Sequence, residues 1–153
     1  LLYFNYRSAQ QKLDALHQKN QIITDSNFII FTSNNKKELL RVTIDDILYL
    51  EGQENYVAVH YLHEKQPTKK LLRSTMQRME ENLNATPILR CHRSFFINST
   101  KISKINRQSS QFTVSLKGVP QEIPVSEEFQ NNINQRTERD KYNSTGATYR
   151  YYL

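Results

Sequence analysis

The sequence predicts a mostly β domain with one or two short helices. Short runs of alternating or continuous apolar residues follow one another, separated by Asn, Asp, Gly, Pro and Ser, which is typical of many short strands. After residue 27, apolar residues fall at helical spacing in only two places. The 153 residues suit one domain with short appendages, and because only 37% of them are hydrophobic, the nine Tyr and seven Phe must supply much of the core.

The first 26 residues allow two interpretations. Leu1–Tyr6 is apolar but too short to cross a bilayer, which needs roughly 20 apolar residues. The segment is either a polar helix or linker, or the end of a membrane segment in a longer parent protein, with Arg7 and Lys12 on the cytoplasmic side. The chain begins with Leu rather than Met, so we expect a fragment, and an apolar run upstream would support the membrane alternative.

From residue 27 the pattern becomes that of strands. Between residues 55 and 62, for example, Tyr56 and Ala58 are expected to point to one side and Val57 to the other. Turn-forming residues at Asp45-Asp46 and at Gln66–Thr68 separate neighbouring runs. The strands predicted in this half of the chain are Asn27–Phe31, Leu39–Ile44, Ile47–Glu51, Asn55–Leu62 and Lys69–Arg73.

The first predicted helix is Ser74–Leu83. Ser74 and Gln77 match the capping-box pattern at its start, and Met79 lies at helical spacing from the flanking apolar residues. The strands predicted after it are Ile88–Ile97, Lys101–Asn106, Phe112–Leu116 and Gln121–Val125.

A second helix is predicted near the end of the chain. Ser126 would cap it, Glu127 suits its positive end, and the helix is expected to run from Glu127 to about Gln135. The domain is therefore expected to occupy residues 27–135, followed by a polar C-terminal tail at residues 136–153.

Positive charge is concentrated in the middle of the chain. The net charge is +6, but residues 65–107 alone hold ten basic side chains against Glu80 and Glu81. This block is expected either to face a polyanion or to form an ordinary solvated surface.

The sequence offers little support for catalysis or metal binding. The single cysteine, Cys91, excludes an internal disulfide and fits a reducing, cytoplasmic location. Its neighbour His92 would point to the other side of a strand, and His60 and His63 would also lie on opposite faces. We therefore expect no enzymatic activity, no metal site and no cofactor.

Residues 89–98 are unusual for a strand. Two arginines, a histidine, a serine and an asparagine interrupt the apolar residues, and each polar group would need a partner if it were buried. A strand end or loop that faces phosphates would favour such residues, because the guanidinium fork of arginine can bind phosphate or the O6/N7 edge of guanine.

These residues, with several other segments in the same order, resemble the LytTR DNA-binding domain, found in the LytR/AgrA family of bacterial transcription regulators. Leu89–Asn98 follows the signature F-x-R-x-H-R-S-[YF]-x-V-N nearly throughout, and the resemblance covers about residues 28–133. The other matching segments are Asp45–Glu51, Glu54–Val57, Lys70–Leu83, Ile102–Ile105 and Ile123–Ser126.

The resemblance implies an elongated fold of antiparallel sheets that binds double-stranded promoter DNA, often at paired direct repeats and as a homodimer on DNA. It implies base contacts from Asn55, Tyr56 and Arg93, and a backbone contact from Ser94. Family members commonly act as response regulators in two-component signalling. A third contact region is expected to begin at Ser126, which is itself an expected DNA-binding residue, although Glu127 stands where many members have a basic residue. The remaining expected DNA-binding residues are His92 and a phosphate-facing set formed by Lys69, Lys70, Arg73, Arg90, Lys101 and Lys104.

A second class of function is also compatible with the charge. A basic protein-interaction or membrane-proximal adaptor would dock on acidic lipid or on an acidic partner, and the full-length protein would then be tethered to the inner face of the membrane. Such an adaptor needs positive charge but has no need for the specific order Arg93-Ser94 within the signature.

Overall fold

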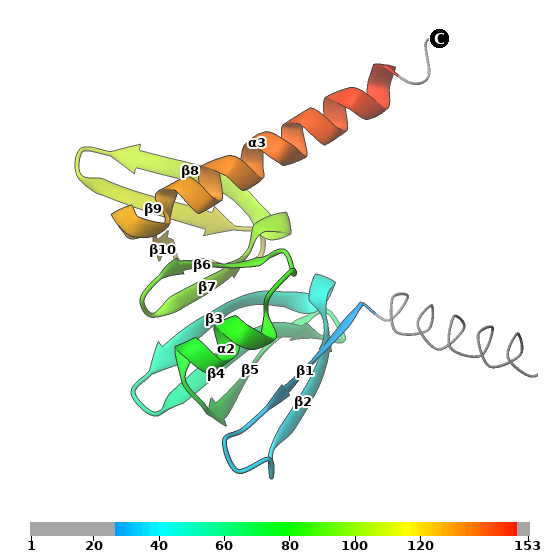
Figure 1. The fold of residues 1–153 in the computed structure, drawn as a ribbon, viewed down its shortest axis with the longest axis vertical. Helices are drawn as coiled ribbons and strands as arrows, with labels where there is room; N and C mark the ends of the chain where they lie inside the picture. Colours follow the sequence, from blue (N-terminus) through cyan, green and yellow to red (C-terminus); the bar gives the residue numbers. More distant parts are fainter. Residues whose placement is uncertain (1–26, 150–153) are drawn as a thin grey trace, which may run out of the picture.

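The computed structural model describes residues 27–149, with side chains described from residue 27 to residue 139. Its strands form three antiparallel sheets, of two, five and three strands. The three-stranded sheet lies above the five-stranded sheet along the long axis of the molecule, and the two-stranded sheet lies beside the lower part of the five-stranded sheet (Figure 1). The mostly β, antiparallel fold predicted from the sequence is confirmed. The expectations for residues 1–26 lie outside the described residues.

The largest sheet has the strand order β5-β4-β3-β7-β6, and a hairpin formed by β1 and β2 packs against it. The strands are β1 (Phe28–Thr32), β2 (Leu39–Thr43), β3 (Ile47–Gln53), β4 (Tyr56–His63), β5 (Gln66–Arg73), β6 (Ile88–His92) and β7 (Phe95–Asn98). The third sheet has the order β10-β9-β8, formed by β8 (Ile102–Gln108), β9 (Gln111–Leu116) and β10 (Ile123–Pro124).

Two hydrophobic cores lie on opposite faces of the five-stranded sheet. One, which includes Phe31, Leu50 and Leu72, is covered by the β1–β2 hairpin and by helix α2 (Met76–Asn82). The other, which includes Leu48 and Ile133, is covered by the three-stranded sheet and by helix α3 (Glu127–Tyr149). Four consecutive residues of β3 are buried because this central strand contributes to both cores.

The predicted turns differ from the observed ones in two places. The β4–β5 hairpin turns at Glu64-Lys65, where both φ angles are positive, and residues 66–68 belong to β5. The long run predicted at Ile88–Ile97 is two strands, because the chain turns at Arg93-Ser94. The predicted turn at residues 45–46 lies in a 3-10 helix, η1 (Ile44–Asp46), and a second such helix, η2 (Ser99–Lys101), follows β7.

The capping box predicted at Ser74 is wrong by one residue. Thr75 is the N-cap, and its Oγ1 accepts a hydrogen bond from the backbone N–H of Arg78 at 3.2 Å. Ser74 does not act as the N-cap, because its side chain is buried at the end of β5 and its hydroxyl has no hydrogen-bond partner among the described residues.

Helix α3 is much longer than predicted. It begins at Glu127 as expected but continues to Tyr149, through residues predicted to form a polar tail. Residues 127–149 contain no proline, and their only glycine is Gly146, so no strong stop signal interrupts the helix before that point. Between residues 27 and 149, no helix is long and apolar enough to cross a membrane.

Candidate nucleic-acid interface

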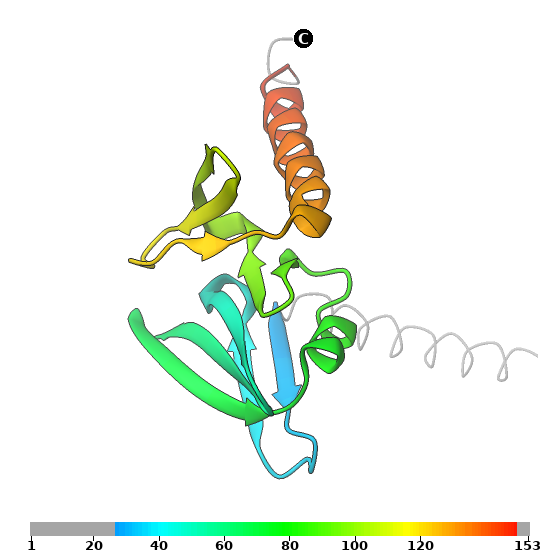
Figure 2. The same cartoon turned by 90° about the vertical axis from the view of Figure 1, so that its left-hand side faces the viewer.

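Two turns that are distant in the sequence lie side by side at one end of the five-stranded sheet. The β3–β4 turn contains Asn55, and the β6–β7 turn contains Arg93 and Ser94. The backbone N–H of Gly52, near the end of β3, donates to the carbonyl of Ser94 at 2.8 Å. Both turns lie on the left-hand side in Figure 1, the side that faces the viewer in Figure 2.

We call this region the turn face. It contains seven of the twelve residues that the sequence singles out for DNA binding, and the structure brings them together from two hairpin turns, the end of β5 and the start of α3. They are Asn55, Tyr56, Arg73, His92, Arg93, Ser94 and Ser126.

The β3–β4 turn presents an amide and an aromatic ring. Glu54 adopts a left-handed conformation with φ of 52°, which makes the tight turn and leaves Asn55 exposed. Tyr56 begins β4 and is 45% exposed, so its ring and hydroxyl are open to solvent. Arg73 is paired with Tyr56 across the sheet and is also exposed, so an amide, a phenol and a guanidinium share this corner.

The β6–β7 turn is held by its own residues. His92 accepts the backbone N–H of Ser94 on Nδ1 at 3.1 Å, and its ring packs at 5.8 Å from that of Phe95. A register shift between Arg90 and His92 marks a β-bulge, a device that redirects side chains at a strand end. The backbone of the turn is therefore fixed while the side chain of Arg93 remains exposed.

Arg90 occupies a different place from the one predicted. Its Nη1 lies 2.6 Å from a carboxylate oxygen of Glu80 on α2, and its other donors reach the carbonyls of His92 and Arg93. A guanidinium committed to three partners inside the protein is not oriented as a phosphate contact.

The loop before α3 joins the same region. The backbone N–H of Ser126 donates to the carbonyl of Cys91 at 2.9 Å, which places the start of α3 beside β6. Ser126 is half-buried, and Glu127 begins the helix exposed to solvent. An acidic residue at a helix start interacts favourably with the helix dipole, and the same charge would repel a phosphate.

The four lysines predicted to face phosphates lie away from the turn face. Lys69 is paired with His60, about 13 Å along β5 from Arg73 at the usual rise per residue. The ammonium of Lys70 donates to the carbonyl of Leu39 in β2 at 3.3 Å. Lys101 and Lys104 lie in η2 and β8, beyond the opposite end of β7.

Gly52 is a residue that our sequence analysis overlooked. A Cβ atom at this position would lie 3.1 Å from two side-chain atoms of Met76, so the absence of a side chain lets α2 approach the junction of the two turns. A glycine inside a strand-like run is the signal that could have identified it.

Comparison with known proteins identifies the family of the chain. The model of the LytTr DNA-binding domain matches residues 37–138 of the chain. The chain belongs to the LytTr DNA-binding domain family. The resemblance identified from the sequence is thereby confirmed, along with the expectation of a DNA-binding domain.

Two individual relatives of this LytTr domain show similarity at low sequence identity. The solved LytTr DNA-binding domain of a Bacillus cereus protein is 21% identical, superposes with a TM-score of 0.56, and matches over 71% of this chain and 94% of its own length. An uncharacterised response regulatory protein of Vibrio cholerae is 21% identical over 97 residues, which are 63% of this chain but only 37% of the relative. The first match supports the fold, and the second shows that the chain spans well under half of that relative.

The cysteine of this LytTr domain is buried in the core, and the described residues form no metal-binding cluster. Burial raises the pKa of the Cys91 thiol to about 12, so the reactive thiolate is not formed near neutral pH. Its sulfur lies 3.6 Å from the carbonyl of Phe95, inside the second core. Within residues 27–139, no group of three potential ligands is arranged to hold a metal ion.

We expect His60 to make the stability of this LytTr domain sensitive to mild acid. Its ring stacks on Tyr49 at 4.0 Å, and burial together with the charge of Lys69 lowers its pKa, although Glu51 acts in the opposite direction. A lowered pKa means that the unfolded chain binds the proton more readily. The contribution of neutral His60 to the free energy of unfolding should therefore be fully present above the ordinary histidine pKa of 6.5, and it should be lost as the pH falls below that value.

Urea unfolding at neutral and mildly acidic pH measures this effect. We expect His60→Phe to reduce the loss of stability between the two pH values, while His63→Gln, at an exposed position, should leave the loss unchanged. An unaltered pH dependence in His60→Phe would show that another group is responsible.

Proposed function

We propose that this LytTr domain binds double-stranded DNA in a sequence-specific manner, with the turn face against the duplex. The observation that carries the proposal is the junction between the β3–β4 and β6–β7 turns, fixed by the Gly52–Ser94 hydrogen bond. It places exposed groups suited to bases and phosphates on one face, although they are far apart in the sequence.

The exposed side chains suggest separate tasks. The guanidinium of Arg93 can bind the O6 and N7 atoms of guanine, and the amide of Asn55 can bind the N6 and N7 atoms of adenine. The exposed Arg73 and Tyr56, together with the half-buried Ser94, suit contacts to phosphate oxygens, which set the position of the domain but carry no sequence information.

We further propose that the domain is the output module of a bacterial transcription regulator. The Vibrio cholerae relative is named as a response regulatory protein, and the unmatched part of that relative leaves room for an input domain. In this proposal two copies bind paired direct repeats in the cytoplasm, and residues 1–26 connect the domain to its input, whether a soluble domain or a membrane tether.

The salt dependence of DNA binding tests how many cations meet phosphates. Two or three cationic side chains near the turn face could contact phosphates. A plot of the logarithm of the DNA-binding constant against the logarithm of the salt concentration should therefore have a slope of about −2 to −3 per domain. Arg73→Ala should make the slope shallower by about 1, because one phosphate contact is lost. Lys104→Ala, far from the turn face, is the matched control and should not change it.

Fluorescence anisotropy with labelled duplex, measured over a series of KCl concentrations, gives both slopes. Affinity that does not change with salt would rule out the proposed interface. If Lys104→Ala, but not Arg73→Ala, makes the salt dependence shallower, the phosphate contacts lie on the other side of the molecule.

Docking on acidic lipid remains the competing function. It predicts that binding follows charge alone, so Arg93→Lys would bind anionic vesicles as well as the unaltered domain does. Base recognition by a planar fork cannot be replaced by an ammonium group, so the same substitution should reduce preference for the selected DNA sequence.

A further inference from the structure

We propose that Glu80 and Arg90 form a clamp that positions the Arg93 turn for DNA recognition. The inference rests on the proposed function and assigns to it two positioning residues that do not themselves contact DNA. It also gives a recognition role to an acidic side chain on α2, a helix that contributes none of the exposed contact groups.

Arg90 holds the turn through its backbone. Its Nη2 donates to the carbonyl of Arg93 at 3.2 Å, and its Nε donates to the carbonyl of His92 at 3.4 Å. The planar guanidinium offers these donors in a fixed relation, so two consecutive peptide units are oriented by one rigid group. With the bonds of Ser94 to His92 and Gly52, each residue of the turn is then tied through its backbone.

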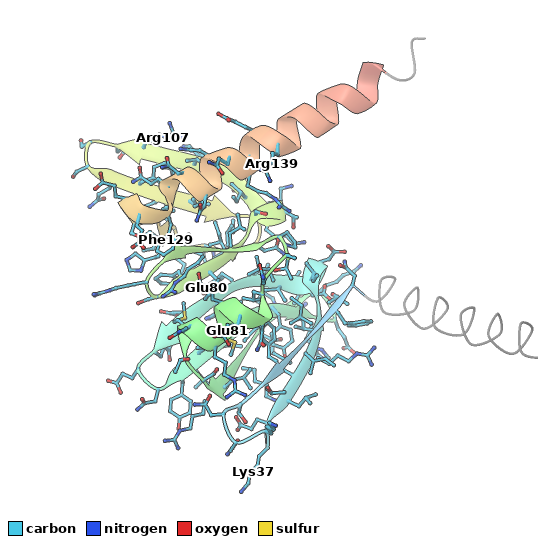
Figure 3. The ribbon with its side chains drawn as sticks, in the orientation of Figure 1. Lys37, Glu80, Glu81, Arg107, Phe129 and Arg139 are labelled. Atoms are coloured by element: carbon cyan, nitrogen blue, oxygen red, sulfur yellow. The ribbon has the colours of Figure 1, made fainter. Side chains whose placement is uncertain are left out.

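Glu80 holds Arg90 in place. Its carboxylate lies 2.6 Å from Nη1, and the guanidinium also lies near the rings of Phe96 and Phe129, at 5.8 and 5.7 Å from their centroids. Figure 3 shows Glu80 on α2 and Phe129 on α3, on either side of β6. The clamp therefore joins the reading turn to both helices.

The exposure of the pair shows which kind of effect to expect. The side chain of Arg90 is 22% exposed and that of Glu80 is 49% exposed, and an ion pair so open to water contributes little to folding stability. Its contribution is to orientation, because an unpaired Arg90 could turn away from the two carbonyls toward solvent or toward a phosphate.

Glu80→Gln distinguishes the clamp from a simple effect of charge, because the two explanations predict opposite changes in DNA affinity. Removing a negative charge near a DNA-binding face should strengthen binding to any duplex if only charge matters. Loss of the clamp should instead weaken binding to the selected sequence about 5- to 10-fold, the size expected for the net contribution of one hydrogen bond, with little change for unrelated duplex.

Glu81→Gln is the matched control. Glu81 is the next residue on α2, is exposed, and loses the same charge without touching the clamp. Arg90→Lys provides a second test, since it keeps the positive charge but cannot serve three partners in one plane. If Arg90 met a phosphate, the lysine would preserve both the salt slope and the sequence preference.

The experiment uses duplex recovered from a random pool with the unaltered domain, and a scrambled duplex of the same composition. Anisotropy competition gives the preference of each variant, and amide NMR shifts of residues 92–94 report whether the turn has moved. We expect Glu80→Gln and Arg90→Lys to lose preference about 5- to 10-fold, with unchanged salt slope and displaced turn resonances, while Glu81→Gln keeps its preference.

Equal behaviour of Glu80→Gln and Glu81→Gln would overturn the clamp, as would an equal loss on both duplexes. A retained sequence preference in Arg90→Lys, with the salt slope unchanged, would make Arg90 a phosphate contact instead. Failure of the unaltered domain to select any sequence would contradict the proposed function itself, so the two failures are distinguishable.

Discussion

Arg93→Ala is expected to weaken binding to the selected DNA sequence by about 1–3 kcal/mol, roughly 5- to 150-fold, while affinity for unrelated duplex falls much less. The reason is that Arg93 is the exposed side chain at the centre of a turn whose backbone is fixed on both sides. Because the turn backbone is already fixed before binding, little conformational entropy is lost there, and most of the contact energy of the Arg93 guanidinium appears as affinity.

The measurement compares the affinity of each variant for two duplexes, the selected sequence and the scrambled one. Binding of the selected and scrambled sequences should converge in Arg93→Ala, and repeated selection with the variant should give a relaxed motif at the positions that Arg93 contacts. Lys117→Ala is a suitable control, because it also removes one exposed positive charge but lies in the turn after β9.

An equal loss of affinity for both duplexes would contradict the assignment. It would mean that Arg93 contacts phosphate and that sequence recognition depends on other residues of the turn face. Asn55→Ala would then be the next variant to compare, because it removes an amide of the adjacent turn without changing the charge.

The sequence predicts the strands well because alternation and turn residues mark them directly. The polar residues at 89–98 indicate a strand end or loop, but they do not place the turn at Arg93-Ser94, because Ser94 is the only common turn-forming residue there. The turn depends instead on bonds from Arg90, His92 and Gly52, and a single sequence does not reveal tertiary hydrogen bonds of this kind.

The sequence indicates the position of a candidate site residue most directly where the residue belongs to a turn. Asn55 and Arg93 are placed by local hairpins, so their order in the signature already indicates their position. Charge alone was a poorer guide: Arg90 pairs with Glu80, and Lys70 bonds to the backbone of β2. A net positive block does not distinguish cations that meet DNA from cations that hold the fold.

Asn98→Ala is expected to lower the free energy of unfolding by about 2–4 kcal/mol, and the midpoint of thermal unfolding by about 10 °C. Asn98 is fully buried, and its amide donates to the carbonyls of Ile44 and Ile47 at 2.9 and 2.8 Å. Its oxygen accepts from the backbone N–H and the hydroxyl of Thr100. Alanine would leave these groups without a partner at the junction of η1, β3 and η2.

Thermal and urea unfolding measure the loss, and Asn84→Ala is the control because Asn84 is exposed in the loop after α2. Well below its midpoint, the folded Asn98→Ala domain should still prefer the selected DNA, since Asn98 ends β7 and the turn face lies at the start of that strand. Similar stability of the two variants would show that water replaces the lost bonds. The expected result would assign two different tasks within the segment Arg90–Asn98. In our proposal its first residues shape the contact with DNA, and its last residue stabilises the fold.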